Sequence, residues 1–325
     1  MTWMNLNPGS ISSLLPDCKI VVTGGAGFIG SHLVSRLLGS TRNIRAIDSL
    51  KYGVWKNIVG DIRSDALIHA NLVDLSTSDM ARQLEGCDVL FHFAAEKHNN
   101  TLDTLHRVIE ANISATARLF DAAGKSGVSK VVFASSLYAY GRLAGTPMTE
   151  TEVPRPATVY GVSKLAGEGL LRETAKRHGY RHVSLRLFFV YGPRQYAGTG
   201  YPSIIVKNFM RIRNREAPVV FGDGSQVLDY VFVDDVVRAV LLAAASSLTD
   251  EVINIGSGVG TSVQHLTERM LRVARSDLAP VYAPPDWTAQ TWRVANIGKA
   301  SALLGFRPEI DLDLGLKRVW SWIAQ

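Results

Sequence analysis

A tyrosine and a lysine four positions apart are the residues of this sequence best suited to acid–base chemistry. Tyr160 and Lys164 stand at positions i and i+4 of an expected helix, so their side chains share one face. A phenol, with an unperturbed pKa of about 10, is a poor base near neutrality, but a neighbouring ammonium group stabilises the phenolate. Ser136 ends an apolar strand upstream, where its hydroxyl could hold a substrate hydroxyl against Tyr160. Because the same spacing occurs on ordinary amphipathic helices, the pattern indicates an active site only in a suitable context.

A glycine-rich turn near the start of the chain supplies that context. The segment 23–30 reads TGGAGFIG and lies between an apolar run at 18–22 and apolar residues at helical spacing. Gly24, Gly27 and Gly30 permit a tight turn and let the backbone approach a pyrophosphate at the start of a helix. Asp48 ends the next apolar run, where a carboxylate accepts from a ribose diol and repels a 2′-phosphate. The pattern favours an NAD site over NADP, and over the alternative of a purely structural turn.

The elements that must position these residues alternate along the chain. Short apolar runs at 18–22, 44–48, 88–93, 130–134 and 183–189 predict strands, and helical patterns lie between them, one of them at 160–178. This alternation predicts an α/β fold with a Rossmann-type, doubly wound parallel sheet. We expect a flexible tail at 1–17, an NAD-binding domain at 18–190 that the chain re-enters around 228–257, and a smaller α/β substrate-binding domain at 191–325.

Composition narrows the class of protein further. The chain has 325 residues and a formal net charge of +6, which suits a globular protein with an anionic ligand. Its two cysteines cannot form a disulfide framework, and the sequence shows neither a signal peptide nor a membrane-spanning run, so we expect a cytoplasmic protein. The eight histidines show no metal-binding spacing. The basic residues at 207–215 are accompanied by a single aromatic residue, Phe209, so we expect no nucleic-acid partner.

Taken together, the motifs resemble those of a known family. The chain is similar to the extended short-chain dehydrogenases/reductases, specifically to the NAD-dependent sugar epimerases and dehydratases. The matching segments are TGGAGFIG at 23–30, HFAA at 92–95, YGVSK at 160–164, VYGPR at 190–194, GDG at 222–224, VDD at 233–235 and LGFRP at 304–308. Within this family the likeness is greatest to the UDP-galactose (UDP-glucose) 4-epimerases.

The resemblance implies roles for individual residues. It implies Ser136, Tyr160 and Lys164 as the catalytic set, with Asn112 supporting the helix that carries them. It implies that NAD is bound by Gly24, Gly27, Phe28, Ile29, Gly30, Asp48, Asn71, Leu72, Phe93, Ala94, Ala95, Lys97, Asn112, Tyr160 and Lys164. For the substrate it implies Ser136 and the position of Phe189, where the family often has asparagine.

Two further departures concern the substrate. Leu228 stands where the family often has an arginine that clamps the substrate diphosphate, and Asn296 where it often has aspartate. Leucine cannot make a bidentate contact to a diphosphate. We expect another cation to replace the arginine, with Arg293 as the first choice and Arg194, Lys207 and Arg211 as the others.

The resemblance implies a nucleotide-sugar epimerase acting at C4 of a UDP-sugar through a transient 4-keto intermediate. The alternatives are a keto-sugar reductase on the same scaffold and a non-catalytic NAD-sensing regulator. Ser135-Ser136-Leu137-Tyr138 lacks the Thr-Asp-Glu of the dehydratases, which makes elimination the weaker hypothesis. The family also implies a homodimer that pairs helices at about 102–124 and 158–178 through Leu105, Ile109, Leu170 and Leu171.

Overall fold

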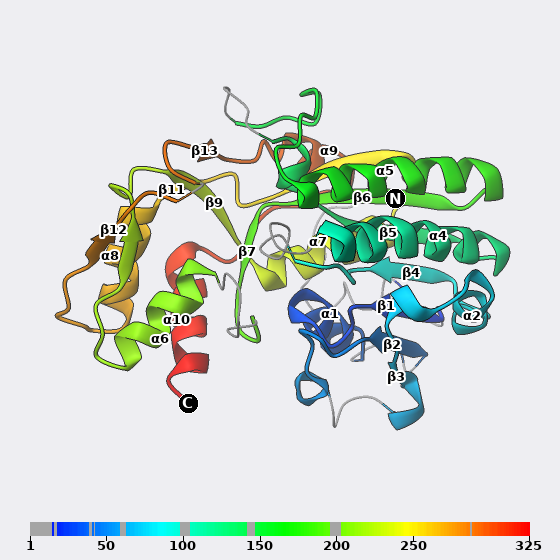
Figure 1. Ribbon diagram of the computed structural model, residues 1–325, viewed down its shortest axis with the longest axis horizontal. Coiled ribbons are helices and arrows are strands. Elements are labelled where there is room, and N and C mark those ends of the chain that lie inside the picture. The colour runs from blue at the N-terminus through cyan, green and yellow to red at the C-terminus, as the bar shows by residue number, and fades with distance from the viewer. Residues whose placement is uncertain are drawn as a thin grey trace.

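Short strands rich in β-branched and aromatic residues form one parallel sheet (Figure 1). The computed structural model describes residues 15, 18–38, 41, 43–58, 63–97, 105–141, 147–195, 203–286 and 288–325, so nearly all of the expected tail lies outside the described residues. Within them the sheet has seven strands, which are β1 (Ile20–Thr23), β2 (Ile44–Asp48), β3 (Leu67–His69), β4 (Val89–His92), β5 (Lys130–Ser136), β6 (Arg181–Leu187) and β10 (Glu251–Ile255). The doubly wound α/β prediction is confirmed.

The strand order places a crevice beside the glycine turn. The strands lie in the order β10-β6-β5-β4-β1-β2-β3, so the connections run to opposite sides from β1. Ligands of such sheets bind where the order reverses, outside the carboxyl ends of the strands. Every residue of β1, β4 and β5 is buried, as expected for a parallel sheet covered on both faces.

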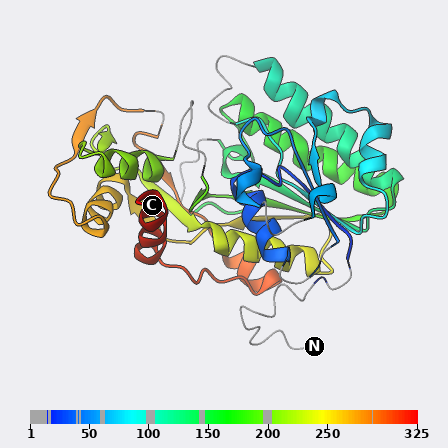
Figure 2. The same cartoon turned by 90° about the horizontal axis from the view of Figure 1, so that it is seen from below.

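Two layers of helices cover the sheet (Figure 2). On one face α1 (Phe28–Leu38), α7 (Val233–Ala245) and α9 (Gly298–Leu304) bury Leu33, Val236 and Leu304 against the strands. On the other face α2 (Thr77–Gln83), α4 (Ala115–Lys125) and α5 (Val159–His178) bury Met80 and Leu119. The sheet is therefore a rigid floor for the loops at its edge.

Local signals explain where the tyrosine-bearing helix α5 begins and ends. The hydroxyl of Thr158 accepts a hydrogen bond from the Gly161 N–H at 3.0 Å, which caps the first turn. Gly179 ends the helix with φ of +84°, a left-handed conformation that glycine adopts without strain. The predicted helix at 160–178 is confirmed within one residue.

The helical pattern expected from Val108 to Phe120 contains an irregular turn. α3 (Leu105–Ile109) and α4 are joined by a π-helical turn at Glu110–Ser114, and Asn112 is buried within it. Such turns insert one extra residue into a helix and often occur at functional sites. Here the turn directs the Asn112 side chain toward the end of β4.

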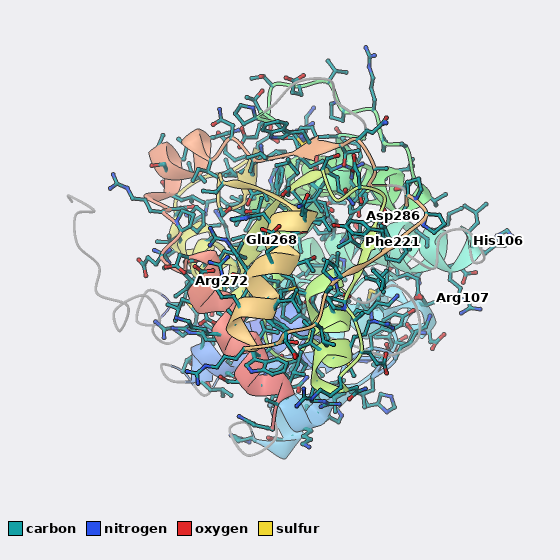
Figure 3. The ribbon with its side chains drawn as sticks, turned by 90° about the vertical axis from the view of Figure 1, so that its left-hand side faces the viewer. His106, Arg107, Phe221, Glu268, Arg272 and Asp286 are labelled. Atoms are coloured by element: carbon teal, nitrogen blue, oxygen red, sulfur yellow. The ribbon has the colours of Figure 1, made fainter. Side chains whose placement is uncertain are left out.

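The remaining elements build a smaller unit beside the carboxyl ends of the sheet. β7 (Phe189–Tyr191), β9 (Val227–Phe232), β11 (Gly260–Ser262) and β13 (Trp292–Arg293) form a four-stranded sheet, and β8 (Val219–Phe221) pairs with β12 (Val281–Ala283). The helices α6 (Ile204–Arg213), α8 (Val263–Val273) and α10 (Leu312–Ile323) cover it. Figure 3 shows this unit from its outer side, with Glu268 and Arg272 on α8.

The chain crosses between the two units more than once. α7 and β10 follow β9 in the sequence, yet they pack on the large sheet, where β10 pairs with β6. α9 joins the same layer before the chain returns to α10. A single cut at 190 therefore does not separate the units. In the part of the chain that the structure describes, no helix is both long enough and apolar enough to cross a membrane.

Candidate active site

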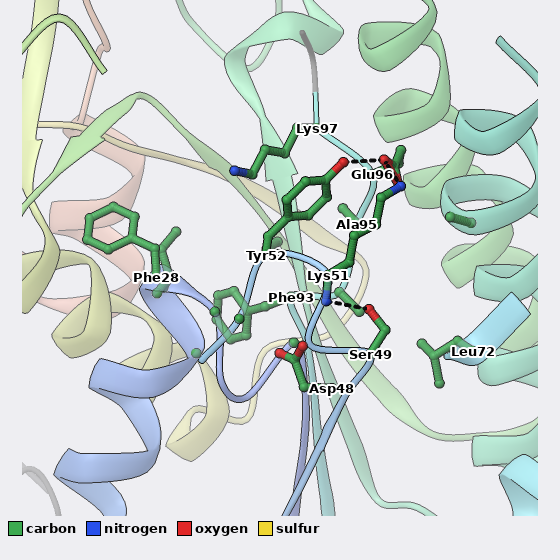
Figure 4. Close-up of a pocket in the computed structure, with 18 of the residues that line it drawn as sticks. Phe28, Asp48, Ser49, Lys51, Tyr52, Leu72, Phe93, Ala95, Glu96 and Lys97 are labelled. Atoms are coloured by element: carbon green, nitrogen blue, oxygen red, sulfur yellow. Dashed lines mark hydrogen bonds and ion pairs between the residues drawn. The ribbon is translucent and has the colours of Figure 1, made fainter. Parts of the chain in front are cut away.

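A cavity of about 700 Å³ opens at the carboxyl ends of the parallel strands (Figure 4). Its lining comes from the glycine turn, from the ends of β2, β4 and β5, and from α5. The residues predicted from the sequence that line it are Gly24, Gly27, Phe28, Ile29, Gly30, Asp48, Asn71, Leu72, Phe93, Ala94, Ala95, Lys97, Ser136, Tyr160 and Lys164. Together with Asn71 and Leu72, which follow β3, the fold thus gathers predicted residues from six separate segments around one cavity.

The glycine turn leaves no room for side chains. Gly24 has φ of +72°, and a Cβ there would lie 2.7 Å from the backbone nitrogen of Ala94. A Cβ on Gly30 would collide with the carbonyl oxygen of Gly24. The turn therefore brings bare backbone to the floor of the cavity, next to the first N–H groups of α1. This arrangement fits a pyrophosphate.

The carboxylate of Asp48 holds the backbone of the glycine turn and can accept further hydrogen bonds from a ligand. Its Oδ2 accepts a hydrogen bond from the Ala26 N–H at 3.0 Å, and its Oδ1 accepts from the Leu50 N–H at 2.8 Å. Burial raises the pKa of this carboxyl, and the backbone N–H groups partly offset that effect. The Gly27 N–H also bonds to this carboxylate, and its two oxygens together still have capacity for a further donor. The site fits a ribose diol.

Asn71 and Leu72 line the cavity beyond β3, at the end where the adenine of NAD is expected. The Asn71 carbonyl accepts from the Val73 N–H at 3.3 Å and its amide donates to Asp74 at 3.1 Å. Leu72 is buried beneath it. The carbonyl oxygen keeps a second lone pair that could accept from an exocyclic amine.

Tyr160, Ser136 and Lys164 meet at the opposite end of the cavity. The side chains of Tyr160 and Ser136 are hydrogen-bonded. Lys164 donates from Nζ to the Ala134 carbonyl at 2.8 Å, and its Nζ lies 5.6 Å from the centroid of the Tyr160 ring. A phenol and a serine hydroxyl side by side can share the hydroxyl of a substrate, one as proton acceptor and one as orienting donor.

Burial governs the protonation of this group. It raises the pKa of Tyr160 to about 12, with only a partial offset from Ser136, and lowers the pKa of Lys164 to about 8, with a partial offset from Glu168. Lys164 by itself therefore does not offset this rise, and the expectation that it acts together with a positively charged nicotinamide remains a prediction. Desolvation of the phenolate outweighs the lysine, because a buried anion loses its hydration. An additional positive charge beside Tyr160 is needed to form the phenolate near neutral pH.

Asn112, predicted to contact the cofactor, does not line the cavity. Its Oδ1 accepts from the Glu96 N–H at 2.7 Å, and its amide donates to the Glu96 carbonyl and to Ser163 Oγ, both at 3.1 Å. It connects the end of β4 to α5 from behind. These bonds favour the supporting role, and contact of Asn112 with the cofactor remains a prediction.

A buried network behind Ser136 escaped the sequence analysis. Ser135 donates to Glu168 Oε1 at 2.5 Å, and Arg186 donates to both oxygens of Glu168 at 2.9 and 2.7 Å. Glu168 stands one helical turn after Lys164, a spacing that could have drawn attention to it. The network ties α5 to the end of β5, which carries Ser135 and Ser136, and to the end of β6, which carries Arg186.

The proposed substrate residues are scattered. Phe189 packs against Tyr230 with ring centroids 6.1 Å apart, whereas Phe188 and Val190 line the cavity. Arg194 is tied to α1, because it donates to the Ser31 carbonyl at 3.2 Å and to Ser35 Oγ at 3.0 Å. Both Phe189 and Arg194 were expected to contact the substrate, but neither is among the residues that line the cavity.

Lys207 and Arg211 also lie away from the cavity. Lys207 sits over the ring of Phe221 at 5.6 Å in the smaller unit, and Arg211 donates to the Ala217 carbonyl at 2.6 Å. Both side chains therefore serve local contacts of α6.

Arg293 differs from these cations in its position. β13 pairs with β9 so that Arg293 is the direct neighbour of Leu228, and both residues are buried. Its guanidinium lies 5.6 Å from the centroid of Tyr138, whose ring packs edge-on against Tyr160 at 5.8 Å. A cation thus stands beside the position of the missing family arginine.

Comparison with known proteins agrees with this geometry. Residues 20–256 match the model of the NAD-dependent epimerase/dehydratase family. The chain is 34% identical to a UDP-glucose 4-epimerase of Thermotoga maritima solved with UDP-glucose, with a TM-score of 0.86 over 93% of this chain and 97% of that one. It is 31% identical to a UDP-N-acetylglucosamine 4-epimerase of Methanobrevibacter ruminantium in complex with UDP-N-acetylmuramic acid, with a TM-score of 0.88 over 94% and 98% of the two chains.

A sequence relative points the same way. A UDP-glucose 4-epimerase of Mycolicibacterium smegmatis is 31% identical over 306 residues, which cover 92% of this chain and 96% of the relative. The chain therefore belongs to the NAD-dependent epimerase/dehydratase family, and NAD is its cofactor. The family membership predicted from the motifs is confirmed.

Proposed function

We propose that this protein is an NAD-dependent nucleotide-sugar epimerase that inverts C4 of a UDP-sugar. The observation that carries the proposal is the pairing of Tyr160 with Ser136 at the end of a cavity that also presents the glycine turn and Asp48. The relatives named as UDP-sugar 4-epimerases cover nearly the whole chain, which supports the same reaction class.

The residues divide the work of the reaction between them. Ser136 orients the C4 hydroxyl of the sugar, and Tyr160 accepts its proton and later returns it. Lys164, fixed by the Ala134 carbonyl, holds a positive charge beside the phenol at neutral pH, because its pKa is about 8. When bound, the cofactor supplies a hydride acceptor and donor together with the positive charge that the buried phenol needs.

The proposal is tested by supplying a panel of UDP- and dTDP-sugars without any added reductant. We expect C4 epimers to form while the amounts of NAD and NADH in the solution stay constant, because the hydride returns to the same sugar. Chromatography that separates isomers of equal mass makes the measurement. Consumption of NADH in proportion to a keto-sugar would replace the proposal with the reductase alternative.

Replacing the phenol isolates the proton transfer. Tyr160→Phe should retain NAD affinity while turnover falls by about 10²–10⁴-fold, the usual contribution of a general acid–base group. Tyr138→Phe, a neighbouring tyrosine in edge contact with Tyr160, is the matched control and should keep most of its turnover. If the Tyr160 variant kept the wild-type rate, another group would have to be the base.

We further propose that Arg293 takes the place of the family arginine at Leu228 and binds the substrate diphosphate. Arg293→Ala should raise KM for the nucleotide sugar by about tenfold or more, since a charge-assisted contact contributes ~1.5–3 kcal/mol. NAD affinity by calorimetry should stay unchanged. Lys207→Ala, which removes a cation lying over Phe221, should leave KM as it is. An unchanged KM for the Arg293 variant would remove this role.

We also propose that the protein is a homodimer. Leu105 and Ile109 on α3 and Val162 on the neighbouring α5 are exposed by 45%, 38% and 47%. Of the other residues expected at this contact, Leu171 is fully buried in the core and is not available to a partner, whereas Leu170 is half-buried. An exposed apolar group on two adjacent helices favours a symmetric helix-to-helix contact.

A further inference from the structure

An ion pair links two loops that the sequence analysis treated separately. Glu96, in the loop after β4, accepts hydrogen bonds from Lys51 Nζ at 2.5 and 2.8 Å and from the Tyr52 hydroxyl at 2.5 Å. Lys51 and Tyr52 belong to the loop after β2. Figure 4 shows the three side chains meeting at one edge of the cavity that they line. We call this group the Lys51–Tyr52–Glu96 strap.

The order of the strands determines what the strap crosses. β1 lies between β2 and β4 in the sheet, so a link between the loops after β2 and β4 must pass over the carboxyl end of β1. The glycine turn begins at that end. A dinucleotide that reaches from Asp48, beside β3, to Tyr160, beside β5, must pass over the same point. The strap therefore lies opposite the turn, on the far side of the path that the dinucleotide takes.

One side of the strap is firmly anchored. The Glu96 side chain is 7% exposed, and the backbone N–H and carbonyl of this residue are both bonded to Asn112. The Nζ of Lys97 lies 4.2 Å from the centroid of the Tyr52 ring, so Tyr52 is in contact with Lys97 as well as with Glu96. The Lys51 side chain, by contrast, is 40% exposed. Opening would therefore start at Lys51, with Glu96 as the fixed point.

We propose that the Lys51–Tyr52–Glu96 strap closes over bound NAD and sets how slowly the cofactor leaves. The inference deepens the proposed function, because an epimerase reuses the NAD that it holds in every cycle and gains from slow release. In this assignment Glu96 and Lys51 are positioning residues that retain the cofactor, and they take no part in proton transfer.

The test measures how fast NAD leaves the purified, NAD-loaded protein after mixing with an excess of an NAD-consuming enzyme, with no sugar present. Lys51→Met and Glu96→Gln should each speed release by about tenfold, which corresponds to about 1.4 kcal/mol. Lys51→Arg keeps the charge and should release NAD at close to the wild-type rate. Asp65→Asn breaks an exposed ion pair with Arg63 on the surface and serves as the matched control with no effect.

Salt provides a second, independent measurement. Because Lys51 is half-exposed, raising the ionic strength should weaken its ion pair and speed NAD release from the wild-type protein. Lys51→Met has no such pair, so its release should respond much less. Equal release from wild type and Lys51→Met, or an equal salt response of the two, would overturn the proposal.

The outcome for the strap is separable from the outcome for the reaction. Release of NAD is followed without substrate, whereas epimerisation is followed on the nucleotide-sugar panel. A protein that epimerises while Lys51→Met holds NAD as long as wild type would refute only the strap. Fast release from Lys51→Met in a protein that epimerises no sugar would refute only the proposed reaction.

Discussion

His92 lies inside the core beneath the site, at the end of β4. Its Nδ1 is 2.7 Å from Thr23 Oγ1 and its Nε2 is 3.0 Å from Thr116 Oγ1, while its ring stacks on Phe133 with centroids 5.6 Å apart. Burial, with a smaller contribution from the charge of Lys164, lowers the pKa of His92 from 6.5 to about 3. The imidazole is therefore neutral in the folded protein and joins two hydroxyl groups across β1, β4 and α4.

This histidine should make the protein sensitive to acid. Below pH 6.5 His92 is protonated in the unfolded chain but stays neutral in the folded protein. The free energy of unfolding therefore falls as the pH drops from about 6.5 to 3, and above pH 6.5 this residue does not affect it. The loss is on the order of 4–5 kcal/mol across the window, at 1.36 kcal/mol per pKa unit.

Chemical unfolding at a series of pH values tests this dependence. His92→Gln should show a shallower fall in unfolding free energy from pH 6.5 to 3 than wild type, whatever its stability at pH 7. His265→Gln, in which an exposed histidine is replaced, serves as the control and should follow the wild-type curve. Parallel curves for His92→Gln and wild type would contradict the assignment.

At the scale of the elements, the π turn between α3 and α4 links helix geometry to the cofactor site. Asn112 within it satisfies the backbone of Glu96 and the hydroxyl of Ser163, both of which belong to segments that line or support the cavity. Asn208 on α6 makes a similar pair of bonds, at 3.0 Å each, to the backbone of Val219 in the smaller unit. Both asparagines are buried, but Asn112 lies beside the cofactor site and Asn208 lies in the smaller unit.

This pair permits a matched experiment. Asn112→Ala and Asn208→Ala should each lower the unfolding free energy by ~1–3 kcal/mol, because each leaves buried backbone groups without partners. Only Asn112→Ala should also weaken NAD binding in calorimetry, since it frees the loop that holds Glu96. Equal NAD affinity in both variants would show that the π turn is purely structural.

At the scale of the whole molecule, the apolar patch of Leu105, Ile109 and Val162 predicts the assembly. Light scattering at micromolar concentration should give about twice the chain mass of 35.4 kDa. Ile109→Glu, which places a charge in the patch, should give the monomer mass. Leu303→Glu alters an equally exposed leucine on α9, in the opposite helix layer, and should remain dimeric. A monomeric wild type would refute the homodimer.

Those parts of the fold that depend on near neighbours can be predicted from the amino-acid sequence. The strands at 44–48 and 130–134, the glycine turn and the helix at 160–178 each follow from the types and spacing of residues within one segment. The parallel order also made it predictable that Asp48, Ser136 and Tyr160 would come to one edge of the sheet. The three residues of β3 are half-buried or exposed and show no alternation of apolar and polar side chains, so the sequence pattern does not predict this strand.

Contacts between distant segments, in contrast, follow from three-dimensional packing alone. The return of β10 to the edge of the large sheet, the inward turn of Leu171 and the placement of Arg293 beside Leu228 all depend on packing between segments far apart in the chain. The same holds for the contact between Tyr52 and Glu96, which are 44 positions apart. No local preference encodes such contacts, because burial and ion pairing act between whichever surfaces the folded chain brings together.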